Sequence, residues 1–202
     1  ARHRLETINK KCDFILLEEE HGTLPIESNS VDLIHCSGVL HHTPNPIAIL
    51  KDFKRILKHE GKAQVMIYNY DSVYFHLYIS YVEMILNKRR LFNSNVYKNF
   101  SRKDVFRMHT DGLSCPISEC WKVQEFIEMV NKADMHCAFK GTAVDLIYEM
   151  KNLPLRFDAI VDKRLNEESR EFLYNLKFDS SGIPIFNGKS AGSHACFELT
   201  NY

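Results

Sequence analysis

The order of apolar and polar positions between residues 24 and 69 predicts a strand, a turn, a helix and a second strand. Val31, Leu33 and Ile34 form a short apolar run between polar residues, which suits a buried strand. Asn45 and Pro46 mark the start of a helix, as its N-cap and its first helical residue. The helix then carries one apolar stripe at the spacing of a buried face: Ile49, Leu50, Phe53, Ile56 and Leu57.

The residues that follow the helix predict how the two strands of this unit are connected. Gly61 is expected to end the helix in the left-handed conformation that glycine adopts readily, and residues 63–68 form the next apolar strand. A strand, a helix and a strand at this spacing form one right-handed crossover of a parallel sheet. The sequence therefore predicts an α/β fold.

Apolar patterns on both sides of this unit predict further elements. We expect a short helix over residues 2–11 with Leu5 and Ile8 inward, an apolar strand over 14–17 and a buried helix over 73–86. A helix with Phe126 on its apolar face leads to a strand over 135–139, and Asn166 separates two helices over 155–165 and 167–178. Residues 194–200 alternate between apolar and polar, as a last strand does. The stretch over about 141–192 is then a helical elaboration of a single domain.

Composition excludes several functional classes. The 202 residues are 45% hydrophobic, which is enough for one domain with a core. Lysine plus arginine and aspartate plus glutamate both number 26, so no overall charge attracts nucleic acid. The six cysteines contain no C-x-x-C pair and no signal peptide is visible, which favours reduced thiols in a cytoplasmic protein. The most apolar run, over 73–86, is too short to span a bilayer.

Four stretches of the sequence resemble one known family. LPIESNSVDLI at residues 24–34, SGVLHHTPNP at 37–46, LKDFKRILKHEG at 50–61 and VMIYN at 65–69 are similar to the class I S-adenosylmethionine-dependent methyltransferases, in the small-molecule branch often called type 11. His59 and Glu60 depart from the family, which usually has Pro and Gly there. The resemblance implies a three-layer α/β sandwich, with a mostly parallel Rossmann-like sheet and an antiparallel last strand beside the fifth.

The resemblance also implies that part of the family fold lies upstream of Ala1. The family carries its glycine-rich cofactor loop after the first strand and a ribose-binding acid after the second, whereas no G-x-G-x-G occurs here. Residues 14–17 would be the third strand, and without a neighbour their backbone groups would be unpaired. We therefore expect this chain to be the carboxyl-terminal two-thirds or more of a longer protein.

By the resemblance, residues that follow the strands hold the cofactor S-adenosylmethionine, since ligands bind at the carboxyl ends of parallel strands. Glu20 is expected to accept a hydrogen bond from the adenine amino group, with the backbone amide of His21 beside it. The alternative is a solvated acidic turn. Ser37 and Gly38 would lie against the methionine portion of the cofactor. The alternative is a tight turn without a cofactor contact, which would need nearly the same residues at these positions. Leu40 is expected to form a wall of the pocket.

The acceptor is expected at the carboxyl end of the strand over 63–68. His42 is a candidate general base, because imidazole titrates near neutrality, and its alternative is a packing residue at a helix start. Tyr68 is a candidate catalytic residue and Asn69 a substrate contact, unless both satisfy local strand-end hydrogen bonds. His109 and Asp111 would contact the substrate from a loop that covers the site as a lid, or form an exposed Asp-Gly turn. No ligand spacing supports a metal site.

A basic segment adds one further hypothesis. Residues 88–107 contain seven basic residues and one acidic residue. Such a run would meet a phosphate-bearing acceptor, although a solvated helix face is the ordinary interpretation. Trp121 is the only tryptophan in the sequence, and we expect it in the core rather than stacked on a cofactor.

Taken together, the sequence predicts methyl transfer from S-adenosylmethionine to a small-molecule or sugar-like acceptor. No nucleic-acid partner and no membrane span are expected, and no oligomeric state is predicted. The alternative from another class is a non-catalytic interaction domain that keeps the methyltransferase fold. A related enzyme such as an aminopropyltransferase ranks third, because SGVLHHTP favours methyl transfer. A strand followed by a G-x-G-x-G loop upstream of Ala1 would favour the enzyme.

Overall fold

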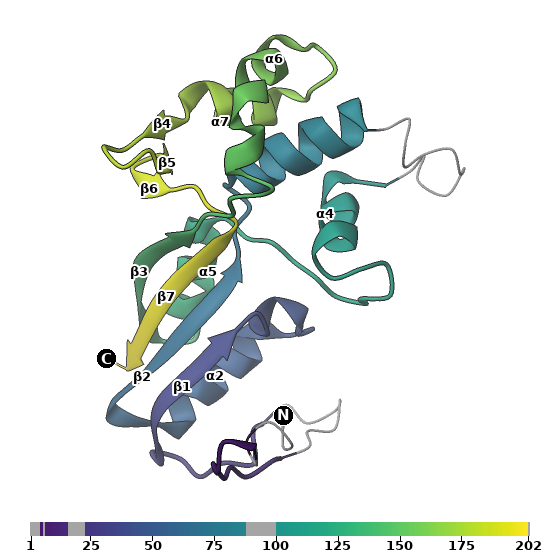
Figure 1. Ribbon diagram of the computed structural model, residues 1–202. Helices are drawn as coiled ribbons and strands as arrows, with labels where there is room; N and C mark the ends of the chain where they lie inside the picture. Colours follow the sequence, from purple (N-terminus) through teal and green to yellow (C-terminus); the bar gives the residue numbers. More distant parts are fainter. Residues whose placement is uncertain (1–4, 6, 16–22, 88–99, 202) are drawn as a thin grey trace.

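The computed structural model describes residues 5, 7–15, 23–87 and 100–201, and a four-stranded mixed sheet forms its centre (Figure 1). The strands lie in the order β1 (Val31–Ser37), β2 (Leu57–Tyr68), β7 (His194–Asn201) and β3 (Met135–Ala143). β1 and β2 pair in parallel, whereas β7 runs antiparallel to both of its neighbours. The predicted α/β class is confirmed, and so is the position of the antiparallel last strand.

The central strand–helix–strand unit forms largely as the sequence pattern predicts. Helix α2 spans Pro46–Ile56, and the Asn45 side chain accepts a hydrogen bond of 3.1 Å from the amide of Ala48. Leu57 was predicted within the helix, but its backbone is extended and it begins β2. Because Leu57 is buried in either conformation, its place in the apolar stripe did not reveal where the helix ends.

Gly61 has a different role from the one predicted. It lies inside β2 and does not adopt the left-handed conformation of a helix C-terminus. The β1–β2 pairing is irregular here, passing from Val31 opposite Leu57 to Leu33 opposite Lys62. A Cβ atom on Gly61 would lie 2.8 Å from the carbonyl oxygen of Val31. Glycine is therefore required because two backbones approach closely, rather than for a turn.

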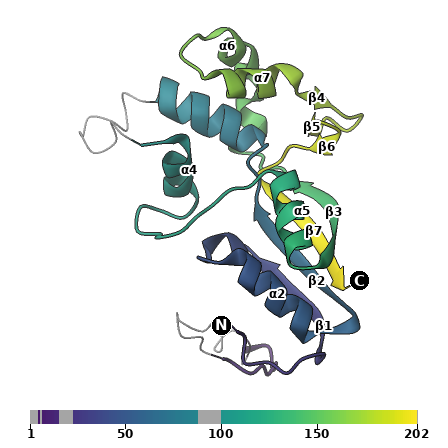
Figure 2. The same ribbon diagram turned by 180° about the vertical axis from the view of Figure 1, so that it is seen from behind.

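One face of the sheet carries the first core. Helices α2 and α5 (Val123–Lys132) lie side by side on this face, as Figures 1 and 2 show. Phe126 of α5 packs on Phe197 of β7 with ring centroids 4.6 Å apart. The predicted alternation of β7 is confirmed, because Ala195, Phe197 and Leu199 are buried and the residues between them are partly exposed.

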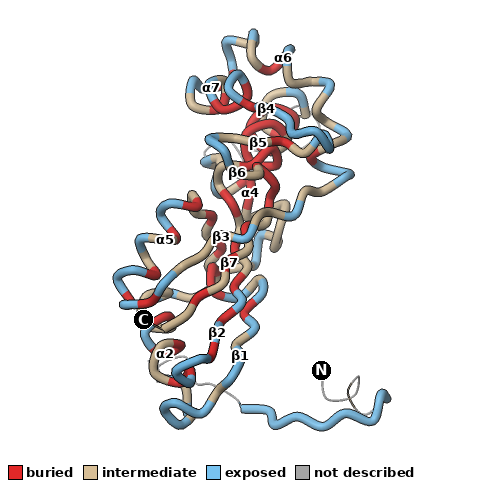
Figure 3. Tube along the Cα trace, turned by 90° about the vertical axis from the view of Figure 1, so that its left-hand side faces the viewer, coloured by how far each residue is buried: buried red, intermediate tan, exposed pale blue. Residues whose placement is uncertain are grey.

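A second, mainly helical region packs beyond the carboxyl end of β2. Helix η2 (Tyr74–Leu86) is a π-helix with a largely buried surface, and η1 (Leu40–His42) is a short 3-10 turn after β1. The other elements of the region are α4 (Arg102–Thr110), η4 (Met150–Leu155), α6 (Arg156–Val161), α7 (Glu167–Asn175) and a small sheet of β4 (Lys177–Phe178), β5 (Pro184–Phe186) and β6 (Lys189–Ser190). Figure 3 shows buried positions both along the large sheet and within this region. The predicted cap is confirmed, since the Asn166 side chain accepts from the amide of Ser169.

The amino-terminal predictions are largely wrong where the structure describes them. Leu5 and Thr7 are helical, but the chain turns at Ile8 and Asn9, and Ile8 is exposed rather than inward. Phe14 and Ile15 have no regular secondary structure and are also exposed, whereas 16–17 lie outside the described residues. Over the part of the chain that the structure describes, no helix is both long and apolar enough to cross a membrane.

Candidate functional site

The carboxyl end of β1 ends in the expected sharp turn. Gly38 has φ +70°, a left-handed conformation that favours glycine, and its amide donates to the carbonyl oxygen of Met66 at 3.2 Å. Ser37 is exposed beside it. Leu40 is fully buried in the core cluster, so it supports the turn from below rather than offering an accessible wall.

Two predicted cofactor contacts, Glu20 and His21, lie outside the described residues. The turn itself fits a backbone contact to a cofactor, since Gly38 carries no side chain and a Cβ atom there would reach only Met66 Cε, at 3.7 Å. The contact of Ser37 and Gly38 with the methionine portion of S-adenosylmethionine stays a prediction from the resemblance.

At the carboxyl end of β2, hydrogen bonds gather around one carboxylate. The Tyr68 hydroxyl donates to Asp111 Oδ1 at 3.0 Å, and the Ser118 hydroxyl donates to Asp111 Oδ2 at 2.6 Å. His42 Nε2 lies 3.5 Å from Asp111 Oδ1. The structure thus brings together three predicted residues, Tyr68, Asp111 and His42, and adds Ser118. We call these four residues the Asp111 cluster.

The hydrogen bonds of His42 define its tautomer. Its Nδ1 lies 2.7 Å from the carbonyl oxygen of Ile117, which can only accept, so Nδ1 carries a proton. In the neutral ring Nε2 is then unprotonated, and it is the nitrogen next to Asp111. A proton accepted at Nε2 would form an imidazolium that the Asp111 carboxylate stabilises, but a general base also needs this nitrogen within hydrogen-bond reach of the acceptor.

The environment assigns different protonation states to the other members. Burial raises the pKa of Tyr68 to about 12, and the nearby charge of Asp111 adds to the shift, so the hydroxyl is a hydrogen-bond donor rather than a base. Burial opposes ionisation of Asp111, but the hydrogen bonds from Ser118, Thr110 and Tyr68 outweigh it and lower the pKa of this carboxyl. Asp111 is therefore a carboxylate at neutral pH.

His41, the neighbour of His42, is a packing residue. It is fully buried and stacks on the Tyr68 ring with centroids 4.0 Å apart. Neither of its ring nitrogens has a hydrogen-bond partner among the residues that the structure describes. Burial lowers the pKa of His41 to about 4, with the charge of His42 contributing, so the ring is neutral.

Asn69 and His109, both predicted substrate contacts, make their contacts elsewhere. The Asn69 side chain is buried and donates to the carbonyl oxygens of Asp71 and Gly192, each at 2.9 Å. His109 Nε2 lies 3.7 Å from Glu83 Oε2, and its ring meets the ring of Tyr78. Asn69 therefore fixes the backbone after β2, and His109 joins α4 to η2.

A cavity of about 190 Å³ lies beside the Asp111 cluster, where β2 and β7 meet. Its walls include four aromatic side chains with one carboxylate and one imidazole: Tyr68, Tyr74, Phe106, Tyr148, Asp145 and His194. We call it the aromatic cavity. Sequence reasoning had singled out only Tyr68, because the other residues come from four separate segments and share no local motif.

A buried carboxylate holds the aromatic cavity together. Glu149 has no exposed surface, and its Oε1 accepts from the amide of Tyr74 at 3.0 Å. Its Oε2 accepts from the amides of Asp145 at 2.6 Å and Ser193 at 3.2 Å. Burial outweighs these hydrogen bonds and raises the pKa of Glu149 to about 7. Three residues that line the aromatic cavity are thus positioned by one side chain.

A possible metal-ligand set that shares His42 and Asp111 with the Asp111 cluster is better explained by hydrogen bonds. Ligand atoms of His42, Asp111 and Cys115 lie within 4.8 Å of one another. However, His42 Nδ1 and Cys115 Sγ both point to the carbonyl oxygen of Ile117, and the Asp111 oxygens accept from hydroxyl groups. We therefore assign no metal to this cluster.

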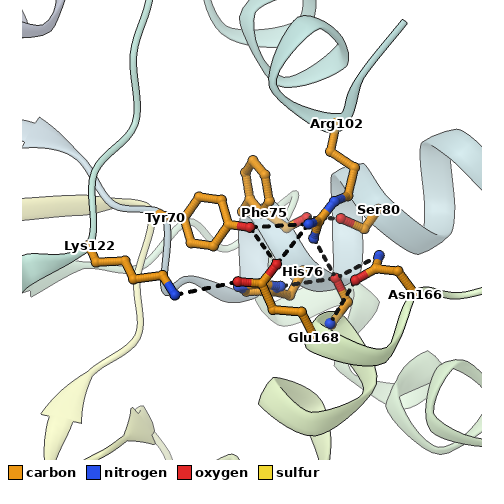
Figure 4. Close-up of polar contacts among 9 residues, drawn as sticks. Tyr70, Phe75, His76, Ser80, Arg102, Lys122, Asn166 and Glu168 are labelled. Atoms are coloured by element: carbon orange, nitrogen blue, oxygen red, sulfur yellow. Dashed lines mark hydrogen bonds and ion pairs between the residues drawn. The ribbon is translucent and has the colours of Figure 1, made fainter. Parts of the chain in front are cut away.

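The described members of the basic segment are ion-paired, whereas 88–99 lies outside the described residues. Figure 4 shows the Glu168 carboxylate of α7 between Tyr70, Arg102 and Lys122. Arg102 lies 2.7 Å and Lys122 3.4 Å from the Glu168 oxygens, and the Tyr70 hydroxyl donates at 2.7 Å. Burial opposes ionisation of Glu168, but the Arg102 and Tyr70 hydrogen bonds lower its pKa to about 2. Arg102 thus joins two elements instead of offering a free phosphate site.

Comparison with known proteins gives a match over the amino-terminal third of the chain. A sequence model of the family described as "Methyltransferase domain" matches residues 1–65. This part of the chain is therefore similar to that family. The resemblance to class I S-adenosylmethionine-dependent methyltransferases is thereby confirmed. An uncharacterized protein of Methanocaldococcus jannaschii is 28% identical over 109 residues, which cover 49% of this chain and 47% of that protein.

Solved structures give weaker similarities. A SAM-dependent methyltransferase of Thermotoga maritima, described as a possible histamine N-methyltransferase, is 16% identical, with 90% of this chain and 61% of that one covered and a TM-score of 0.46. A Haloferax volcanii putative methyltransferase, solved with the Trm112 methyltransferase activator, is 15% identical, with 98% and 67% covered and a TM-score of 0.49. Scores this low carry no functional argument. The chain spans about half the length of the curated relative that it matches.

Proposed function

We propose that this chain contributes the acceptor side of an S-adenosylmethionine-dependent methyltransferase that acts on a small molecule. The observation that carries the proposal is the Asp111 cluster at the carboxyl end of β2, next to the aromatic cavity. In a parallel α/β sheet, ligands bind at this edge. Residues 1–65, which match the family, supply the neighbouring Ser37–Gly38 turn.

The cofactor, when bound, supplies an electrophilic methyl group on a sulfonium. The protein's own residues have three tasks. Ser37 and Gly38 would hold the methionine portion, and the aromatic cavity would place the acceptor in line, since alignment alone supplies much of the barrier reduction for such a transfer. His42 Nε2, which faces Asp111, would take a proton from the acceptor, and Asp111 would stabilise the imidazolium that forms.

Tyr68 acts on Asp111 rather than as a base in this proposal. Its hydroxyl donates to Oδ1, the same oxygen that faces His42. The hydrogen bond fixes this oxygen and leaves the Tyr68 lone pairs available to a donor on the acceptor.

Localisation in the cytoplasm remains an expectation from the cysteine content.

The proposal is tested by calorimetric titration of S-adenosylhomocysteine into the full-length gene product and into this 202-residue chain. We expect the full-length protein to bind, and the isolated chain to bind poorly if the predicted upstream cofactor loop is needed. The matched variant is His42→Ala in the full-length protein, which should retain this affinity. A folded full-length protein without measurable affinity would favour the non-catalytic interaction domain.

A further inference from the structure

The aromatic cavity has the charge of a site for cations. Asp145 is the one carboxylate among its lining residues, and no lysine or arginine lines it within the described parts of the chain. The Asp145 side chain is held in place, since Oδ1 accepts from the amide of Tyr148 at 2.6 Å. Burial lowers the pKa of His194, so this ring adds no positive charge at neutral pH.

The aromatic walls meet at steep angles. The rings of Tyr74 and Phe106 are 5.6 Å apart at 87°, and those of Tyr74 and Tyr148 are 5.8 Å apart at 81°. Tyr68 and Phe106 meet at 77°. Aromatic rings that line a cavity offer π-electron density to a cation inside it, which is how proteins bind ammonium groups.

We infer that the aromatic cavity receives the amino nitrogen of the methyl acceptor, so that the acceptor is a small amine; the inference rests on the proposed methyl transfer. The cavity volume of about 190 Å³ admits an amino group with its substituents rather than a large molecule. The Asp145 carboxylate and the faces of Tyr74 and Tyr148 then surround the nitrogen.

The charge of the lining matches the charge that forms during the reaction. An amine that enters as an ammonium first loses a proton to water. The lone pair of the neutral amine then forms a bond to the methyl carbon, the carbon–sulfur bond breaks, and its electron pair stays on sulfur. Positive charge therefore passes from sulfur to nitrogen. A carboxylate and aromatic faces that are already in place stabilise this charge. If the amine still carries a hydrogen, the proton leaves afterwards to water or to His42.

A sugar-like acceptor fits the lining less well. Sugar hydroxyls need several hydrogen-bond partners when they lose water. The hydroxyls of Tyr68 and Thr110 both donate to Asp111, and the Ser193 hydroxyl lies 2.8 Å from His194 Nδ1, so these three hydroxyls already have partners. The lining thus favours an amine with a small apolar body over a polyhydroxyl compound.

The test uses choline, a probe that cannot accept another methyl group and so reports binding alone. Its matched neutral analogue carries a tert-butyl group in place of the trimethylammonium group. Both are titrated into the full-length protein and into this chain, with affinity followed by calorimetry and by the tyrosine ring signals in NMR spectra. We expect choline to bind about tenfold more tightly than the analogue.

Two variants separate the contribution of the Asp145 charge to choline binding from that of the Tyr148 ring. Asp145→Asn retains an acceptor for the Tyr148 amide and should remove most of the preference for choline. Tyr148→Leu removes a partly exposed ring and should weaken choline binding about fivefold with little effect on the analogue. Asp158→Asn, an exposed carboxylate on α6, is the matched control and should change neither affinity.

Equal affinity for the two probes would overturn the inference, and so would a preference for choline that survives in both variants. S-adenosylhomocysteine is titrated in parallel. Cofactor binding without a choline preference would refute the amine acceptor alone. A choline preference without cofactor binding to the full-length protein would instead refute methyl transfer and leave a cation site.

Discussion

The pH dependence of stability at Glu149 tests which of two opposing effects dominates in this fold. Its carboxylate is fully buried, which favours the protonated form, yet it accepts three backbone N–H groups, which favour the charged form. Burial wins, and the pKa rises from 4.5 to about 7. Glu149→Gln removes the titration while it retains the size of the side chain.

The expected magnitude follows from this shift. Each pKa unit corresponds to about 1.4 kcal/mol, so a rise from 4.5 to about 7 corresponds to about 3 kcal/mol. Because the pKa is higher in the folded protein, the contribution is complete below the unfolded-state value of 4.5. It is lost as pH rises through about 7. The unfolding free energy of the wild type minus that of Glu149→Gln should therefore fall by about 3 kcal/mol over this range.

The assay is urea unfolding followed by circular dichroism at several pH values from 4.5 to 8. Taking the difference between the two proteins cancels the titration of every group that they share. Glu171→Gln, at an exposed position of α7, is the control and should give a flat difference. A difference that rises with pH would refute the reasoning, because it would show that the three N–H donors keep Glu149 ionised.

Three further predictions concern single contacts. His42→Ala should lower turnover of the full-length enzyme by roughly 10²–10⁴ with cofactor affinity unchanged. Tyr68→Phe should lower turnover less. Normal turnover in both variants would mean that alignment of the acceptor with the cofactor is enough for methyl transfer. Gly61→Ala should lower the free energy of unfolding in urea by about 1–3 kcal/mol, because its Cβ would lie 2.8 Å from the Val31 carbonyl oxygen. An unchanged midpoint would show that the β1 backbone can shift to make room for the Cβ atom. Glu168→Gln should lower stability by only about 1 kcal/mol, since this ion pair is partly exposed, and the loss should shrink at high salt.

The strand–helix–strand unit could be predicted because each of its signals is local. Asn45 and Pro46 act within one helical turn, and the apolar stripe reports the buried face directly. The prediction went wrong at Leu57 and Gly61, where the outcome depends on the neighbouring strand. Val31 approaches Gly61 through the sheet pairing, and nothing within one turn of helix reveals this contact.

The amino-terminal strand shows the same limit. The apolar run at Phe14 and Ile15 matched a strand pattern, but a strand forms only where another strand pairs with it. Among the described residues, Phe14 and Ile15 belong to no strand, and both are exposed. An apolar run predicts a tendency to form a strand, whereas the presence of a pairing strand decides whether the strand forms.

The candidate site could be predicted in part. The sequence singled out Tyr68, His42 and Asp111 as separate candidates, but it did not pair them. Tyr68 and Asp111 are 43 residues apart, and Ser118 is one of many loop serines, so no spacing rule links them. Glu149 gave no signal at all, because two of its three partners are backbone amides 75 and 44 positions away.

The contacts after β2 show how the later part of the chain controls the site. Three residues in the seven-residue segment from Tyr68 to Tyr74 are each held by a carboxylate from a later segment. Asp111 binds the Tyr68 hydroxyl, Glu168 binds the Tyr70 hydroxyl, and Glu149 binds the Tyr74 amide. Two of these carboxylates belong to the stretch that the sequence presented as an elaboration, and neither reaches the Asp111 cluster itself. We therefore expect this stretch to set the shape of the aromatic cavity and hence the choice of acceptor, while residues 1–65 carry the features shared with the family.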